Sequence, residues 1–201
     1  MTAEELVRAA AAGDAGAFEQ LVRLYEKKVY ALALRMCGNP EDASDAAQEA
    51  FLSAWKGLPN FRGESGFSTW MYRLTTNAAI DHLRKGKRQR EETSLDDSET
   101  PLHIPDQSPG PQESAEGAEL REAVTAGLQA LSEDHRKILI LREYQELSYE
   151  EIADVLDMDL GTVKSRISRA RQALRKILLK KGNLSGYLPS KYSEKRKEGR
   201  S

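Results

Sequence analysis

Apolar residues recur every three or four positions along most of this chain, which is the period of an α-helix with one buried face. The first long stripe follows Asp14, whose carboxylate is suited to cap the start of a helix. Gly38, Asn39 and Pro40 predict its end, because glycine tolerates a left-handed turn and proline cannot continue a helix. The stripe consists of Phe18, Leu21, Val22, Tyr25, Val29, Leu32 and Met36.

The same period predicts two more helices in the first half of the chain. One extends from about residue 41 to residue 58 and is closed by Pro59, and the other extends from about residue 68 to residue 85. The segment 60–67 between them carries glycine, serine and phenylalanine, which indicates a loop. The first half is therefore expected to be helical throughout.

A change of composition divides the chain into two parts. Residues 91–114 carry several prolines and many acids but few large apolar residues, which predicts a flexible acidic linker. Helical periodicity resumes at Leu120, and Ser132 is expected to cap a later helix. Residues 182–201 indicate a flexible basic tail. The fold class is thus all-α, with two small helical domains, residues 5–90 and 115–181, joined by the linker.

Residues 147–179 predict two helices that meet at a tight turn. Ser148 followed by Glu151 is a capping box at the start of the first helix. The second helix is apolar on one face and basic on the other, with eight Lys or Arg residues and no acid between positions 161 and 181. A basic helix docked on a partner helix suits the major groove of DNA. An amphipathic helix with a merely solvated charged face is the alternative. The polar candidates are Lys164, Ser165, Ser168, Arg169 and Gln172.

Aromatic residues and cations lie together in residues 61–90. The aromatic members are Phe61, Phe67, Trp70 and Tyr72, and the polar members on one helical stripe are Arg73, Asn77 and Arg84. Aromatic rings stack on unpaired bases while cations follow phosphates, so the cluster favours single-stranded nucleic acid. Alternatively, the rings close the core beneath the loop, and for Trp70 the two interpretations are equally supported.

An acidic face is predicted on the helix that begins near residue 41. Its members are Glu41, Asp42, Asp45, Gln48 and Glu49, opposite an inward face that contains alanines and Phe51. Paired carboxylates can perform acid–base chemistry, but no histidine lies nearby. The sequence favours a protein-docking surface over a solvated face, and both over catalysis.

The overall charge changes this interpretation little. The net charge is −2, but the total hides segregation: residues 73–90 contain six cations and one acid, whereas residues 91–122 contain ten acids and one cation. Local charge sets the affinity for phosphate. The chain shows no phosphate-binding loop, no nucleophile motif and no metal-ligand spacing around Cys37, which is expected to be a plain core residue. We therefore expect no enzyme activity, no cofactor and no metal.

The sequence contains no pattern typical of a membrane-spanning helix or of a secretory signal. No apolar run approaches the length needed to span a bilayer, and the acidic N-terminal segment is unlike a secretory signal. The sequence predicts a cytoplasmic protein without membrane insertion.

Both halves resemble one family, the extracytoplasmic-function sigma factors of bacterial RNA polymerase. The order of residues 45–51, 61–73 and 77–81 is similar to region 2 of that family, and the order of residues 131–136, 147–153 and 161–171 is similar to region 4. The resemblance covers about residues 5–90 and 115–180. It implies a subunit that binds core RNA polymerase, recognises promoters and helps to open the minus-10 element.

The resemblance also implies roles for particular residues. The acidic face would dock on the clamp helices of the polymerase β′ subunit, and Asn77 with the loop 61–70 would lie near an extruded base. The helix that begins near residue 161 would read the minus-35 element, with Arg171 at a phosphate. Members of the family commonly bind an anti-sigma factor. Asp157 departs from the glycine frequent in such turns, so a local difference is expected there.

Two other classes of protein compete with this interpretation. A stand-alone helix-turn-helix regulator would bind duplex operators without polymerase, but it would have no use for base-stacking residues in segment 61–90. A helical module that binds only proteins would not explain the acid-free basic helix.

Overall fold

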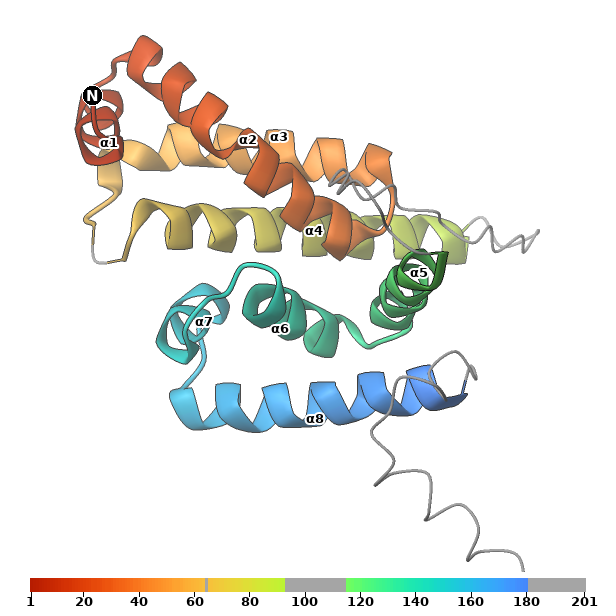
Figure 1. Cartoon of the computed structure of the whole chain (residues 1–201). Coiled ribbons are helices and arrows are strands. Elements are labelled where there is room, and N and C mark those ends of the chain that lie inside the picture. The colour runs from red at the N-terminus through yellow and green to blue at the C-terminus, as the bar shows by residue number, and fades with distance from the viewer. Residues whose placement is uncertain (64, 93–114, 181–201) are drawn as a thin grey trace, which may run out of the picture.

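The computed structural model describes residues 1–63, 65–92 and 115–180, and every regular element in those ranges is helical. The predicted linker and tail fall almost entirely outside the described residues. The helices form two groups, α1 to α4 and α5 to α8, which lie one above the other in Figure 1. The helices are α1 Ala3–Ala11, α2 Ala15–Cys37, α3 Pro40–Gly57, the 3₁₀ turn η1 Leu58–Asn60, α4 Phe67–Glu92, α5 Ala115–Gln129, α6 Glu133–Glu143, α7 Tyr149–Leu156 and α8 Leu160–Lys180.

Local signals at both ends of α2 act as the sequence predicts. The Asp14 carboxylate accepts a hydrogen bond from the amide of Ala17 at 3.0 Å. Gly38 ends α2 with φ +85°, a left-handed conformation that glycine adopts without a steric penalty. Asn39 then caps α3 by accepting a hydrogen bond from the amide of Asp42 at 2.8 Å. These caps fix the direction of the chain as it turns from α2 into α3.

Small residues allow the helices of the first group to pack closely. α3 packs against both α2 and α4. Because its buried positions are alanines spaced three or four residues apart, the neighbouring backbones can approach without large side chains between them. These alanines, all fully buried, are Ala43, Ala46, Ala50 and Ala54.

The core of the second group forms around α6 and α8. α6 buries the run from Ile138 to Leu141, and the apolar stripe of α8 faces it through Val163, Ile167 and Ala170. Ser132 occupies the N-cap position of α6 as predicted, although its hydroxyl makes no capping hydrogen bond. The negatively charged Glu133 and Asp134 in the first turn of α6 stabilise this end of the helix, because it is the positive end of the helix dipole.

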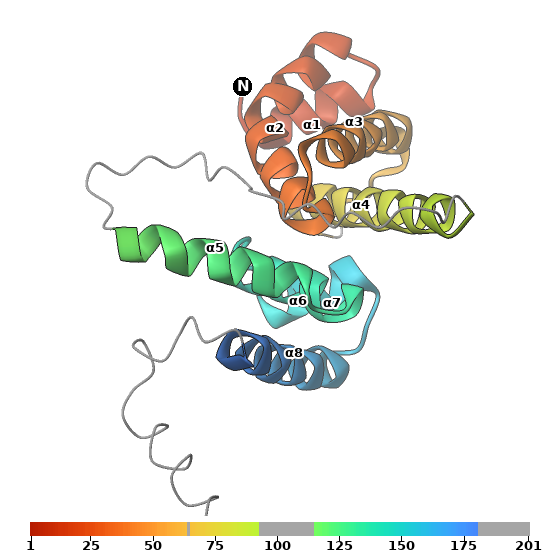
Figure 2. The same cartoon turned by 90° about the vertical axis from the view of Figure 1, so that its right-hand side faces the viewer.

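The two groups pack against each other through α4 with α7 and α2 with α6. Figure 2 shows the first group above the second, with α8 on the side of the second group that faces away from α4. α7 therefore covers part of α4, whereas α8 has one face open to solvent.

Candidate nucleic-acid interface

The turn between α7 and α8 is built by local hydrogen bonds. Ser148 and Glu151 form the predicted capping box at the start of α7. Asp157 ends α7 with φ +51° and ψ +58°, so this aspartate adopts the left-handed conformation for which many such turns use glycine. The Asp159 carboxylate accepts a hydrogen bond from the amide of Thr162 at 2.8 Å and thereby caps α8. That bonding lowers the pKa of Asp159.

The polar face of α8 points away from the core. Ser165 is half-buried and donates its hydroxyl hydrogen to the carbonyl oxygen of Thr162 at 3.0 Å, which leaves the oxygen lone pairs as acceptors. The other predicted contact residues are all exposed, so the face presents both cations and short polar groups. They are Lys164, Ser168, Arg169, Arg171 and Gln172.

Two arginines of α8, Arg166 and Arg171, lie against acids of α6. The Arg171 guanidinium donates to one carboxylate oxygen of Glu143 from Nη2 at 2.6 Å and from Nε at 3.0 Å, which raises the pKa of Arg171. Arg166 is only 34% exposed and lies 3.6 Å from Asp134. Arg166 thus faces the domain, while Arg171 lies at the border between the domain and the open face.

On α4, the predicted polar stripe is present. Arg73 and Asn77 are exposed, and Arg84 is exposed but lies 3.4 Å from the carboxylate of Glu133 on α6. The stripe therefore borders the contact between the two groups of helices. An exposed amide between two arginines has donors and an acceptor available for the edge of a base.

The aromatic residues beside this stripe pack on one another. The Trp70 ring centroid lies 4.8 Å from that of Phe61 and 5.8 Å from that of Phe67, and Phe67 also packs edge-on against Tyr25. Trp70 is only 8% exposed, whereas Phe61 and Phe67 are half-buried. In this conformation Trp70 supports the loop from below, and the two phenylalanines are the rings that a base can reach.

The predicted acidic face of α3 is divided by its surroundings. Asp42 is partly buried, and its carboxylate accepts a hydrogen bond from the side-chain amide of Asn39 at 2.6 Å. Asp42 therefore stabilises the start of α3. Asp45, Gln48 and Glu49 are exposed. These three residues remain available to a protein partner.

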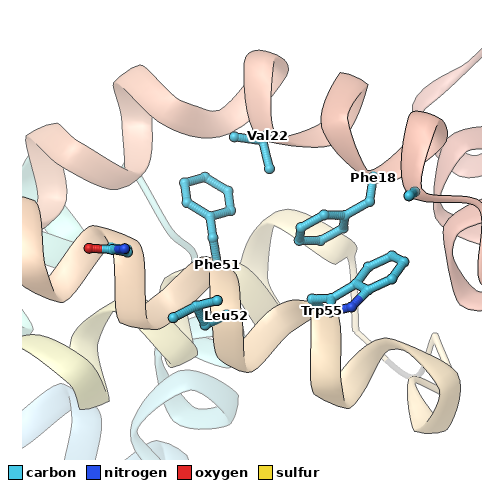
Figure 3. A pocket seen from close by; sticks show the side chains of 7 residues that line it. Phe18, Val22, Phe51, Leu52 and Trp55 are labelled. Carbon is cyan, nitrogen blue, oxygen red and sulfur yellow. The ribbon is translucent and has the colours of Figure 1, made fainter.

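An open apolar groove lies beside the acidic face, between α2 and α3. Its volume is about 440 Å³. Figure 3 shows Phe18 and Val22 of α2 opposite Phe51 and Trp55 of α3, and the Phe18 and Trp55 ring centroids are 4.9 Å apart. The sequence pattern does not reveal the groove, because Phe18, Val22 and Phe51 lie on apolar faces that predict a closed core. The lining residues are Ala15, Phe18, Val22, Gln48, Phe51, Leu52 and Trp55.

Within residues 1–63, 65–92 and 115–180, no group of three or more His, Cys, Asp and Glu side chains is placed to hold a metal ion. None of the described helices has the length and apolarity needed to cross a bilayer. Cys37 is buried in the core, and this burial raises its pKa to about 12.

Comparisons with known families match both groups of helices. Residues 21–89 match the model of sigma-70 region 2, and residues 121–174 match that of sigma-70 region 4. The chain is 40% identical to the RNA polymerase sigma-H factor of Pseudomonas aeruginosa, over 87% of this chain and 93% of that protein. It is 38% identical to the ECF RNA polymerase sigma-E factor of Escherichia coli, with the same two shares covered.

Two solved structures share the architecture. One is the sigma factor RpoE of Bartonella quintana in complex with the anti-sigma factor NepR, with a TM-score of 0.66 and 26% identity over 80% of this chain and 96% of that chain. The other is CnrH in complex with the cytosolic domain of CnrY, with a TM-score of 0.62 and 26% identity over 86% and 94% of the two chains.

Proposed function

Since the chain belongs to the extracytoplasmic-function sigma factors, which direct RNA polymerase to promoters, we propose which of its surfaces performs each step. The α2–α3 groove and its acidic border would bind core polymerase. The polar stripe of α4 with the Phe61 and Phe67 rings would capture the minus-10 element, and the open face of α8 would read the minus-35 element. We assign residues 5–90 to region 2 and residues 115–181 to region 4.

The polymerase surface is the part of the proposal that the structure supports most strongly. Leu52 and Trp55 are large apolar residues that remain 45% and 36% exposed at the groove. Covering such residues with a partner removes apolar surface from water and so favours binding. The neighbouring Asp45 and Glu49 would select a basic partner. An apolar groove with an acidic border fits a helical element of polymerase that is apolar along one face and basic beside it.

The two surfaces proposed to bind DNA, on α8 and on α4, carry different chemical groups, which suit duplex DNA and an unpaired base respectively. α8 combines exposed arginines with hydroxyl and amide groups, a set suited to phosphates and base edges in a major groove. α4 combines Asn77 with cations and nearby aromatic rings, a set suited to an unpaired base. The presence of these two faces and the docking groove on one chain is the observation that carries the assignment.

Regulation is proposed to come from a second protein. One of the solved structures described above contains the anti-sigma factor NepR bound to its sigma factor, and the other contains the cytosolic domain of CnrY bound to CnrH. An anti-sigma factor that covers the α2–α3 groove would block polymerase directly. We place this chain in the cytoplasm, where polymerase acts.

Affinity purification with core polymerase tests the docking surface. The double variant Asp45→Lys, Glu49→Lys should lose core binding, because it repels a basic partner, while its helical circular dichroism and melting temperature stay close to the wild type. Glu19→Lys with Glu26→Lys places the same charge change on exposed positions of α2 as a control. Wild-type assembly by the Asp45, Glu49 variant would refute the assignment of this surface.

A further inference from the structure

Two arginines border the buried stripe of α8, one on each side. At about 100° per residue around the helix axis, Arg166 and Arg171 lie about 70° to either side of the centre of that stripe. Each arginine meets an acid of α6: Arg166 lies 3.6 Å from the carboxylate of Asp134, and Arg171 lies 2.6 Å from that of Glu143. The helix on which α8 packs therefore also holds a cation at each margin of α8.

The two ion pairs differ in what else the acid binds. Asp134 lies 2.6 Å from the ammonium group of Lys137 on its own helix, and this hydrogen bond is the largest cause of the lowered pKa of Asp134. Lys137 is buried, so Asp134 compensates a charge inside the domain. Glu143 is 46% exposed and accepts two hydrogen bonds from Arg171, at 2.6 Å and 3.0 Å. Glu143 is thus directed at a cation on the border of the open face.

The hydrogen bonds to Glu143 use one edge of the Arg171 guanidinium. A guanidinium carries five N–H donors in a fixed planar fork. One Glu143 oxygen accepts from Nε and Nη2, which leaves a second edge, formed by Nη1 and the other hydrogen of Nη2, that does not face the carboxylate. A phosphate binds such an edge by two parallel hydrogen bonds. Because the Arg171 side chain is 52% exposed, this second edge is available to a phosphate while Glu143 stays bound.

The place of Arg171 on α8 suits a phosphate better than a base. The open face of α8 is centred near Ser165 and Gln172, and Arg171 lies about 110° from that centre. When the centre of such a face meets the floor of a major groove about 12 Å wide, side chains at this angle lie beside the sugar–phosphate backbone. Contacts to phosphates fix the register and orientation of a protein on the duplex. The orientation of Arg171 therefore bears on how α8 is seated.

We propose that Glu143 is a positioning residue for promoter recognition, which holds Arg171 so that its free edge meets a backbone phosphate only when α8 is seated in the major groove. This role presupposes the proposed assignment of α8 to the minus-35 element. Glu143 acts through Arg171 and itself contacts neither base nor phosphate. The carboxylate thereby raises the ratio of specific to non-specific binding.

Two physical effects make the held arginine selective. An arginine on a free stem can follow phosphates in any register, which favours every DNA sequence alike. Glu143 orders Arg171 before DNA arrives, so the seated complex does not lose that side-chain freedom on binding. In other registers the held guanidinium does not reach a phosphate, and the negative charge of Glu143 repels the backbone. The pair therefore favours the seated complex over all others.

Fluorescence anisotropy with the full chain and two labelled duplexes of equal length measures this selectivity. One duplex carries a minus-35 element selected by holoenzyme from a random-sequence pool, and the other carries the same bases in scrambled order. Glu143→Ala should lower the ratio of the two affinities by about 2- to 12-fold, which corresponds to the ordering of one long side chain. On the scrambled duplex, the slope of log affinity against log salt concentration should steepen by about 0.9, because Arg171 becomes a further phosphate contact.

Glu122→Ala is the matched control, because it removes the same charge from an exposed position on α5. Its affinity ratio and its salt slope should equal those of the wild type. Glu143→Gln keeps one acceptor for Arg171 and should retain more of the wild-type ratio than Glu143→Ala. An unchanged ratio and slope for Glu143→Ala, or an equal fall of the ratio for Glu122→Ala, would overturn the proposal.

The variant Arg171→Ala separates positioning from a purely structural role. In a chain that already lacks the Arg171 guanidinium, Glu143→Ala should leave the ratio of affinities unchanged. A purely structural ion pair would instead lower the melting temperature when broken and weaken binding to both duplexes in proportion to the folded fraction, with no steeper salt slope. A fall of the ratio caused by Glu143→Ala in the absence of Arg171 would contradict the role of the pair.

The arginine variants test the assignment of α8 separately. If Arg169→Ala and Arg171→Ala bind the minus-35 duplex as tightly as the wild type, the assignment of α8 has failed. If these two variants lose affinity while Glu143→Ala keeps the wild-type ratio, α8 binds DNA and only the positioning role of Glu143 is refuted.

Discussion

The exposed surface of Trp55 allows the strength of polymerase docking to be predicted. An aromatic side chain carries about 150–250 Å² of surface. Because Trp55 is 36% exposed, a partner that covers the groove removes at most about 50–90 Å² from water. At about 25 cal/mol per Å², burial of this area is worth about 1.3–2.3 kcal/mol. Trp55→Ala should therefore weaken binding to core polymerase by about 10- to 50-fold.

Competition between labelled wild-type protein and unlabelled variants for core polymerase measures this loss. Trp55 also packs on Phe18, so thermal melting must show that Trp55→Ala remains folded at the assay temperature. Leu24→Ala is the matched control, because Leu24 is 56% exposed on α2 and does not line the groove. Equal competition by folded Trp55→Ala and Leu24→Ala would refute the proposed role of the groove.

Three other predictions concern α8 and its turn. Arg169→Ala should weaken DNA binding by about 1–3 kcal/mol and relax the preference at one base pair. Arg171→Ala should weaken binding to all promoter sequences equally and reduce the slope of log affinity against log salt concentration by about 1. Filter binding over a series of salt concentrations distinguishes the two outcomes. The pKa of Asp159 is lower in the folded protein than in the unfolded chain, where it is roughly 3.9. The ionised cap therefore stabilises the fold above that pH, and this stabilisation is lost as the pH falls through the pKa of the folded state. Asp159→Asn should therefore show less acid-induced unfolding by circular dichroism below about pH 4. Asp157→Val should lower the free energy of unfolding by roughly 1–2 kcal/mol in urea, because a branched side chain opposes φ +51°, and Asp157→Gly should not.

The sequence predicted those parts of the fold that depend on neighbours along the chain. The Asp14 cap, the Gly38 turn and the Ser148–Glu151 capping box each require only residues within one helical turn. The apolar stripe of α8 was also predicted correctly, because helical periodicity alone determines which residues share a face. Ser132 was placed correctly at the N-cap of α6, but its hydroxyl does not bond to the helix, because a capping residue type does not fix the orientation of its side chain.

Features that depend on packing between distant segments were not predictable. Phe18 and Phe51 belong to apolar stripes, and only the spacing of α2 and α3 leaves them lining an open groove rather than a closed core. Burial of Trp70 depends on Phe61 and Phe67 folding over it. The docking of Arg136 on the end of α2 joins residues 100 positions apart, which no local pattern reveals.

Opening of the minus-10 element tests the account most directly. Permanganate footprinting with holoenzyme should show that Asn77→Ala slows opening of duplex promoter DNA while core binding and minus-35 recognition persist, since the variant removes only the amide beside the unpaired base. A template already mismatched across the element should recover much of the deficit. Equal opening of the duplex by Asn77→Ala and wild-type holoenzyme would contradict the assignment of α4.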